Sequence, residues 1–92
     1  MDECEYIIYV QFSSELTNVI DYTDKIKEYS VDNSIEIISD ELTNTFEIYN
    51  YKMCVRKYDY DADIDVILNF IQEIDPKGTI TILSVPSKYL SS

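Results

Sequence analysis

One segment, residues 58–74, combines a dense run of acidic residues with a clear helical pattern. It reads YDYDADIDVILNFIQEI and begins with carboxylates at every second position: Asp59, Asp61, Asp63 and Asp65. Apolar residues then recur at the i, i+3, i+4, i+7 spacing of one helix face: Ile64, Ile67, Leu68, Ile71 and Ile74. Pro76 and Gly78 end the pattern. The segment predicts an acidic ladder that leads into an amphipathic helix and supplies part of a core.

The N-terminal part of the chain predicts a strand followed by a helix. Residues 5–12 are rich in β-branched and aromatic residues and place Tyr6, Ile8, Val10 and Phe12 on one face, as a central strand does. Ser13 or Ser14 is expected to cap a helix that ends near Tyr29. The expected buried stripe of this helix is Leu16, Val19, Ile20, Thr23 and Ile26.

The remaining segments complete a β-α-β-β-α-β order. Residues 31–34 predict a turn, residues 35–39 a strand, and residues 40–44 a polar hairpin connection. Residues 45–58 predict either one bent strand or two short ones, because their alternation slips near Asn50, which suggests a bulge. Residues 79–85 predict a last strand, before a tail at 86–92. The fold class is therefore α+β, a ferredoxin-like antiparallel sheet with two helices on one face.

Net charge limits the partners of such a chain. It carries 18 acids and 7 bases, a net charge of −11 on 92 residues, while its 46% hydrophobic content is that of one folded domain, residues 1–92. Such a surface repels nucleic acid and anionic membranes and attracts basic proteins. Solubility is the common explanation of acidity, but at −11 self-repulsion is a cost to the fold.

Catalysis and metal binding find little support. Histidine, the commonest general base, is absent, and a single glycine excludes a Gly-rich phosphate loop. Asp59, Asp61 and Asp63 match the start of a calcium loop, but the glycine position is Ile64 and the bidentate glutamate position is Phe70. Acids in the first turn of a helix stabilise it, which accounts for two or three of the ladder acids. We therefore expect no enzyme activity, no cofactor and no metal site.

The two cysteines and the nine tyrosines carry less specific information. Cys4 and Cys54 form no metal pattern and no disulfide framework. With no signal peptide and no apolar run of about 18 residues, the chain is expected in the cytoplasm with reduced thiols. Tyrosine is common both in half-buried strands and at protein interfaces.

Carboxylates that fall on one helix face or along the ladder are the candidate partner-binding residues. Asp21, Asp24 and Glu28 lie at i, i+3 and i+7, opposite the expected buried stripe. The full candidate set is Asp21, Asp24, Glu28, Asp59, Asp61, Asp63, Asp65 and Glu73. A duplex about 30 Å long presents about 18 phosphate charges, the same order as the acids of this chain. Rows of fixed carboxylates are therefore expected to occupy a DNA-binding site as a DNA mimic.

The size, acidity and histidine-free, Ile/Tyr/Asn/Asp/Lys-rich composition resemble those of the anti-restriction DNA-mimic (Arn) proteins of T-even phages. The resemblance covers the character of the whole chain and includes no diagnostic motif, so no site residue is transferred by it. It implies a phage protein in the host cytoplasm, a dimer that blocks a restriction nuclease or another DNA-binding protein. A homodimer would lengthen the acidic rows, and strand edges around Tyr49 and Tyr51 are the expected contact.

Two alternatives remain open. The first is a dedicated inhibitor or immunity protein for one basic nuclease toxin, with a local acidic patch and tyrosine anchors. The second is a small regulatory or structural module with no charged partner. Two separated acidic rows favour a mimic, one patch favours the dedicated inhibitor, and scattered charge favours the module.

The charge balance predicts that salt stabilises the fold. Repulsion between exposed charges is screened over about 10 Å at 0.1 M salt, so moderate sodium chloride should raise the melting temperature. Thermal denaturation at low and moderate salt measures this. A melting temperature that falls over that range would mean that favourable surface ion pairs dominate.

Overall fold

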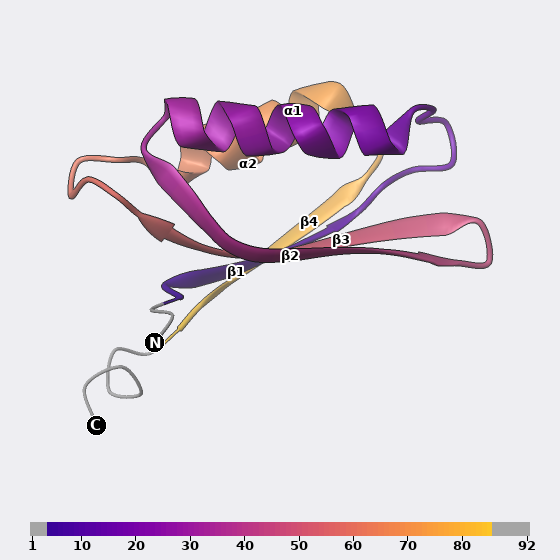
Figure 1. Ribbon diagram of the computed structural model, residues 1–92. Coiled ribbons are helices and arrows are strands. Elements are labelled where there is room, and N and C mark those ends of the chain that lie inside the picture. Colours follow the sequence, from indigo (N-terminus) through magenta and orange to yellow (C-terminus); the bar gives the residue numbers. More distant parts are fainter. Residues whose placement is uncertain (1–3, 86–92) are drawn as a thin grey trace.

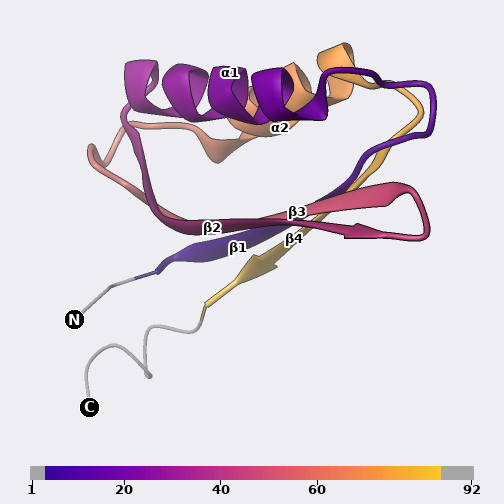
Figure 2. The same cartoon turned by 45° about the vertical axis from the view of Figure 1, so that its right-hand side comes forward.

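Six helices and strands make up the part of the chain that the computed structural model describes, residues 4–85 (Figure 1). They are β1 (Tyr6–Gln11), α1 (Val19–Asp32), β2 (Ile35–Thr45), β3 (Ile48–Lys57), α2 (Ile64–Ile74) and β4 (Thr79–Ser84). All neighbouring strands are antiparallel, and their order across the sheet is β2-β3-β1-β4. Both helices cover one face of the sheet and leave the other face open (Figures 1 and 2). The predicted ferredoxin-like arrangement is confirmed.

The core fills the space between the helices and the sheet. Side chains of the two central strands alternate into it: Ile8, Val10, Tyr51, Met53 and Val55. α2 contributes Ile67 and Ile71, the middle of its predicted apolar face. The helices meet where the rings of Tyr29 and Phe70 stack with centroids 4.1 Å apart. Within residues 4–85, no helix is long and apolar enough to cross a membrane.

The first helix begins later than the sequence suggested. Its N-cap is Asn18, in the left-handed conformation, and neither Ser13 nor Ser14 caps it. The buried face is Val19, Thr23, Ile26 and Ser30, at i, i+4, i+7 and i+11. Ile20 was wrongly placed in the buried stripe: it lies beside this face and is 66% exposed. The helix also runs to Asp32, so the expected turn is confined to residues 33 and 34.

The β2–β3 hairpin differs from its prediction in two ways. The expected connection at residues 40–44 is part of β2, and the turn is only Phe46 and Glu47, both with positive φ (52° and 66°). β3 is regular through Asn50; the irregularity lies in β2, between Ile37 and Ser39. The sequence alternation slipped because Phe46 belongs to the turn and Ile48 to the open face, a change of register that a two-residue turn permits.

The expected strand edge at Tyr49 and Tyr51 is wrong, while the dimer itself stays a prediction. Both residues belong to β3, which lies between β2 and β1 and has no free edge. Tyr51 is also 1% exposed, and its hydroxyl donates a hydrogen bond to Asp40 at 2.8 Å. Burial, together with this carboxylate, raises the pKa of Tyr51 far above its ordinary value. The tyrosine is therefore a core residue with a satisfied polar tip.

A buried carboxylate joins the exit of β1 to the exit of α2. Asp75, 7% exposed, accepts hydrogen bonds from the backbone N–H and the hydroxyl of Ser13, both at 2.6 Å. The hydroxyl of Ser13 is thus used in this contact, six positions before the first residue of α1. The same contact explains the single glycine: a Cβ on Gly78 would lie 2.6 Å from Asp75 Oδ2 and 2.8 Å from the carbonyl oxygen of Gln11.

Substituting Gly78→Ala should therefore destabilise the fold by overpacking, by about 1–3 kcal/mol, which lowers the melting temperature by several degrees. Urea denaturation of G78A, D75A and the double variant measures the effect. Because part of the conflict is with Asp75 Oδ2, the losses of the single variants should not add in full, although the contact with the Gln11 carbonyl oxygen remains in the double variant. Fully additive losses would place the conflict at the Gln11 carbonyl oxygen alone. If the stability of G78A equals that of the wild type, the close approach at Gly78 is contradicted.

Candidate acidic interface

All eight predicted partner-binding acids are exposed. Three lie on α1 (Asp21, Asp24, Glu28), four on or beside the loop between β3 and α2 (Asp59, Asp61, Asp63, Asp65), and Glu73 lies near the end of α2. The helical acids are exposed because they lie off the buried faces of their helices, and Asp59 and Asp61 because they lie in a loop. Exposure alone does not distinguish a binding surface from a merely solvated one. The location and the partners of each acid are needed to make that distinction.

The row on α1 is longer than the sequence suggested. Asp32 follows Glu28 by four residues, falls on the same face and is exposed, so it completes the row Asp21, Asp24, Glu28, Asp32. The spacing was visible in the sequence, but the helix was expected to end near Tyr29, which left Asp32 in a turn. Four carboxylates over 11 residue steps stand about 5.5 Å apart along the helix axis.

The ladder acids divide into two pairs. Asp63 is the N-cap of α2, where its side chain accepts a hydrogen bond from the backbone N–H of Asp65 at 3.0 Å. Asp65 lies in the first turn, at the positive end of the helix. The side chains of Asp59 and Asp61 make no hydrogen bond or ion pair within the described chain. Stabilisation of α2 thus explains Asp63 and Asp65, and it does not explain Asp59 and Asp61.

The end of α1 and the ladder meet at one end of the molecule. The N–H of Tyr58 donates to the carbonyl oxygen of Ser34 at 2.8 Å. Asn33 and Ser34, directly after α1, line a hollow together with Asp59 and Asp61. Figure 1 shows this loop beside the C-terminal end of α1, away from the tip of the β2–β3 hairpin. Glu73 is not part of this group, because it lies at the other end of α2.

Two exposed tyrosines alternate with the acids of the loop. Tyr60 is 93% exposed and Tyr58 62% exposed, although most other tyrosines of the described chain are half-buried or buried. Sequence reasoning assigned the tyrosines mainly to strands and did not select these two. We call Glu28, Asp32, Asp59 and Asp61, with Tyr58 and Tyr60, the acidic end.

The acids in the C-terminal half of α1, Glu28 and Asp32, are unfavourable for the helix that carries them. Asp32 stands in the last turn, where the partial charge of the helix is negative, and no base lies there. Glu28 has like charges at i−4 (Asp24) and i+4 (Asp32), each such pair costing about 0.2–0.5 kcal/mol. Lys27 relieves only Asp24, at 3.8 Å, and pairs more closely with Asp40, at 3.3 Å. Two further ion pairs within residues 4–85, Arg56–Glu36 and Lys77–Glu15, involve acids outside the eight candidates.

The pKa of the Cys4 thiol and the spacing of the acid and cysteine side chains bear on nucleophilic and metal chemistry in the described chain. Cys4 and Cys54 are free, and burial, with a smaller contribution from Cys54, raises the pKa of the Cys4 thiol, whereas a nucleophilic cysteine needs a lowered one. In residues 4–85, no three acid or cysteine side chains gather closely enough to hold a metal ion.

Comparisons with known proteins identify the fold and no family. No family model and no curated protein matches the sequence. Among solved structures, an ACT domain protein from Streptococcus pneumoniae is similar, with a TM-score of 0.62 and 14% identity over 99% of this chain and 98% of that chain. The de novo designed protein Foldit4 is also similar, with a TM-score of 0.58 and 13% identity over 89% of this chain and 97% of that one. At these identities, the likeness concerns the ferredoxin-like fold alone.

The position of the acids predicts opposite effects of neutralising them. Glu28→Gln with Asp32→Asn should stabilise the protein by about 1 kcal/mol, raising the melting temperature by about 4–8 °C, because both changes remove repulsion from α1. Asp63→Ala should instead cost about 1 kcal/mol by removing an N-cap. Thermal denaturation at low salt measures both. If the E28Q/D32N variant melts at or below the wild-type temperature, these acids are not a cost to the fold.

Proposed function

We propose that this protein is a non-catalytic inhibitor that covers the DNA-binding surface of a basic protein, with carboxylates in place of DNA phosphates. The observation that supports the proposal is the acidic end, whose carboxylates either weaken α1 or have no side-chain partner among residues 4–85. A surface that needed charge only for solubility would mix signs and favour positions that stabilise the helices. Acids kept at unfavourable positions point to a requirement outside the fold.

Charge spacing supports a phosphate-like role. The row on α1 places one carboxylate per about 5.5 Å, against one phosphate per about 3.4 Å on each strand of duplex DNA. The row thus imitates part of one DNA strand, and the ladder extends it around the end of the molecule. The long axis of the molecule, 42 Å, corresponds to about 12 base pairs at 3.4 Å each. A basic groove that holds one turn of duplex is of matching size.

The class of target follows from charge and from the resemblance of the sequence to Arn-type anti-restriction proteins. A DNA-binding site presents several lysines and arginines in a row, which is the feature that a row of acids recognises. A restriction nuclease is the first candidate, and other DNA-binding proteins carry the same feature. The inhibitor itself would bind neither nucleic acid nor anionic membranes, because both repel its surface.

A dedicated inhibitor of one basic nuclease is the second candidate, and two observations favour it. Glu28 and Asp32, the last two acids of the row on α1, lie at the same end of the molecule as Asp59 and Asp61, which makes one patch there rather than two separated rows. Tyr58 and Tyr60 add exposed aromatic rings, which serve as interface anchors and pack well against arginine. Such anchors would recognise one partner and would resist salt better than charge alone.

Charge reversal with a matched control tests the proposal. Asp59→Lys with Asp61→Lys should weaken binding to the target by 10-fold or more, about 1.4 kcal/mol. Glu41→Lys with Glu47→Lys changes the net charge equally, on exposed positions of the β2–β3 hairpin, and should have a much smaller effect. Asp63 is left unchanged because it caps α2. Partners are captured from a bacterial lysate on the immobilised protein, eluted with duplex DNA, and their affinities for each variant are then measured.

Three results of that experiment discriminate between the candidates. Nucleic-acid-binding partners that duplex DNA displaces, with affinity that falls steeply with salt, support the mimic. One partner that survives high salt and loses affinity with Tyr60→Ala supports the dedicated inhibitor. Partners that do not bind nucleic acid, or equal losses in the D59K/D61K and E41K/E47K variants, would rule out the proposed role of the acidic end.

A further inference from the structure

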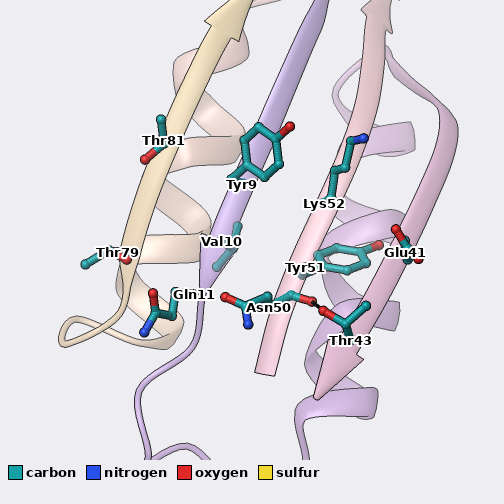
Figure 3. Close-up of a pocket in the computed structure, with 10 residues that line it drawn as sticks. All are labelled: Tyr9, Val10, Gln11, Glu41, Thr43, Asn50, Tyr51, Lys52, Thr79 and Thr81. Carbon is teal, nitrogen blue, oxygen red and sulfur yellow. Dashed lines mark hydrogen bonds between the residues drawn. The ribbon is translucent and has the colours of Figure 1, made fainter. Parts of the chain in front are cut away.

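The open face of the sheet, opposite the helices, carries a row of neutral polar side chains across all four strands. Thr43 faces Asn50, Asn50 faces Gln11, and Gln11 faces Thr79 in the strand register. Figure 3 shows the two carboxamides side by side at the centre of the sheet. Among the described residues, neither side-chain amide has a hydrogen-bond partner, so each retains donors and an acceptor for a ligand.

A second row lies next to the first and contains an exposed aromatic ring. Tyr9 stands on the central strand β1, is 41% exposed, and faces Lys52 on one side and Thr81 on the other. Its ring presents its face outward from the sheet in Figure 3. The ammonium of Lys52 lies over this ring, 5.9 Å from its centroid, so the ring already carries a weak cation–π contact.

These two rows enclose a shallow hollow of about 270 Å³. Its floor is the backbone of β1 and β3, and its walls are the two carboxamides, the tyrosine ring and hydroxyl groups. The hollow is thus a flat aromatic platform bordered by hydrogen-bond donors and acceptors that point along the sheet. A solvated sheet face needs neither feature, since scattered threonine, lysine and glutamate side chains suffice for it.

The ligand that fits such a site is planar, aromatic and polar at its edge. A nucleobase stacks on a tyrosine face, and a carboxamide can pair with a donor and an acceptor of the base edge at the same time. Charge excludes a phosphorylated ligand: Lys52 is the one cation of the hollow, Glu41 faces it across the strands, and the chain carries −11 overall. A chain of phosphates is repelled even more strongly.

We propose that this hollow binds a neutral nucleobase or nucleoside, stacked on Tyr9 and held at its edge by Gln11 and Asn50. The site shares no residue with the acidic end and lies on the other side of the sheet from the helices. Whether this hollow binds a nucleoside can therefore be tested independently of the proposed function of the acidic end.

Calorimetric titration of the full chain with adenosine, guanosine, cytidine and uridine tests the site. At least one nucleoside should bind saturably with one site per chain. Tyr9→Ala should weaken that binding about fivefold or more, as the loss of a base–aromatic stack does, and Tyr9→Phe should retain it. Gln11→Ala with Asn50→Ala should also weaken it and should change the preference among the four bases. Leu83→Ala, on β4 outside the hollow, is the matched control and should bind as the wild type does.

The charge of the ligand provides the second part of the test. The 5′-monophosphate of the preferred nucleoside should bind more weakly than the nucleoside at low salt, and a single-stranded oligonucleotide more weakly still. Tighter binding of the monophosphate or the oligonucleotide would overturn the assignment of a neutral ligand. No saturable binding of any of the four nucleosides, or equal affinity of the wild type and the Y9A variant, would overturn the site itself.

Discussion

The pairing of Asp75 with Ser13 is the constraint on which the arrangement of the layers depends. One buried carboxylate receives two hydrogen bonds from the residue that follows β1 by two positions, and so fixes where α2 ends relative to the central strand. Truncating either partner would leave a buried polar group unpaired, at a cost of about 1–3 kcal/mol. Gly78 permits the close approach, so β4 can turn directly from α2 into its place beside β1. These contacts thereby fix the position of the helix layer relative to the sheet.

The order of the elements followed from the sequence because each element has a strong local signal. The apolar face of α2 and the alternation of β1 both come from burial on one side, which periodicity reports directly. The boundaries that failed depended on contacts distant in the sequence. Ser13 resembles an N-cap until its partner 62 positions away is known. A turn made of Phe46 and Glu47 has none of the asparagine or glycine that normally marks such a turn, so the hairpin looked like a longer connection.

The candidate site was predictable in composition and not in arrangement. Helical spacing placed Asp21, Asp24 and Glu28 on one face, and the same rule reaches Asp32 once the helix is extended by one turn. The convergence of α1 with the ladder could not be predicted, because it depends on the contact between Tyr58 and Ser34 and on the antiparallel packing of the helices. The exposure of Tyr58 and Tyr60 could not be predicted either, because the sequence does not show whether a tyrosine will lie in a loop or in a strand.

The position of β1 in the sheet has a consequence for how the chain acquires its structure. The first strand of the chain lies between β3 and β4, and its partners are 39 positions away at the nearest (Gln11 and Asn50) and 78 at the farthest (Tyr6 and Ser84). Only the β2–β3 hairpin can close locally, so pairing of the central strand waits for loops that are slow to close. During synthesis, β1 would remain without one of its two neighbours until the last strand has left the ribosome. The interval before β4 arrives is therefore when the apolar alternation of β1 is most open to pairing with another chain.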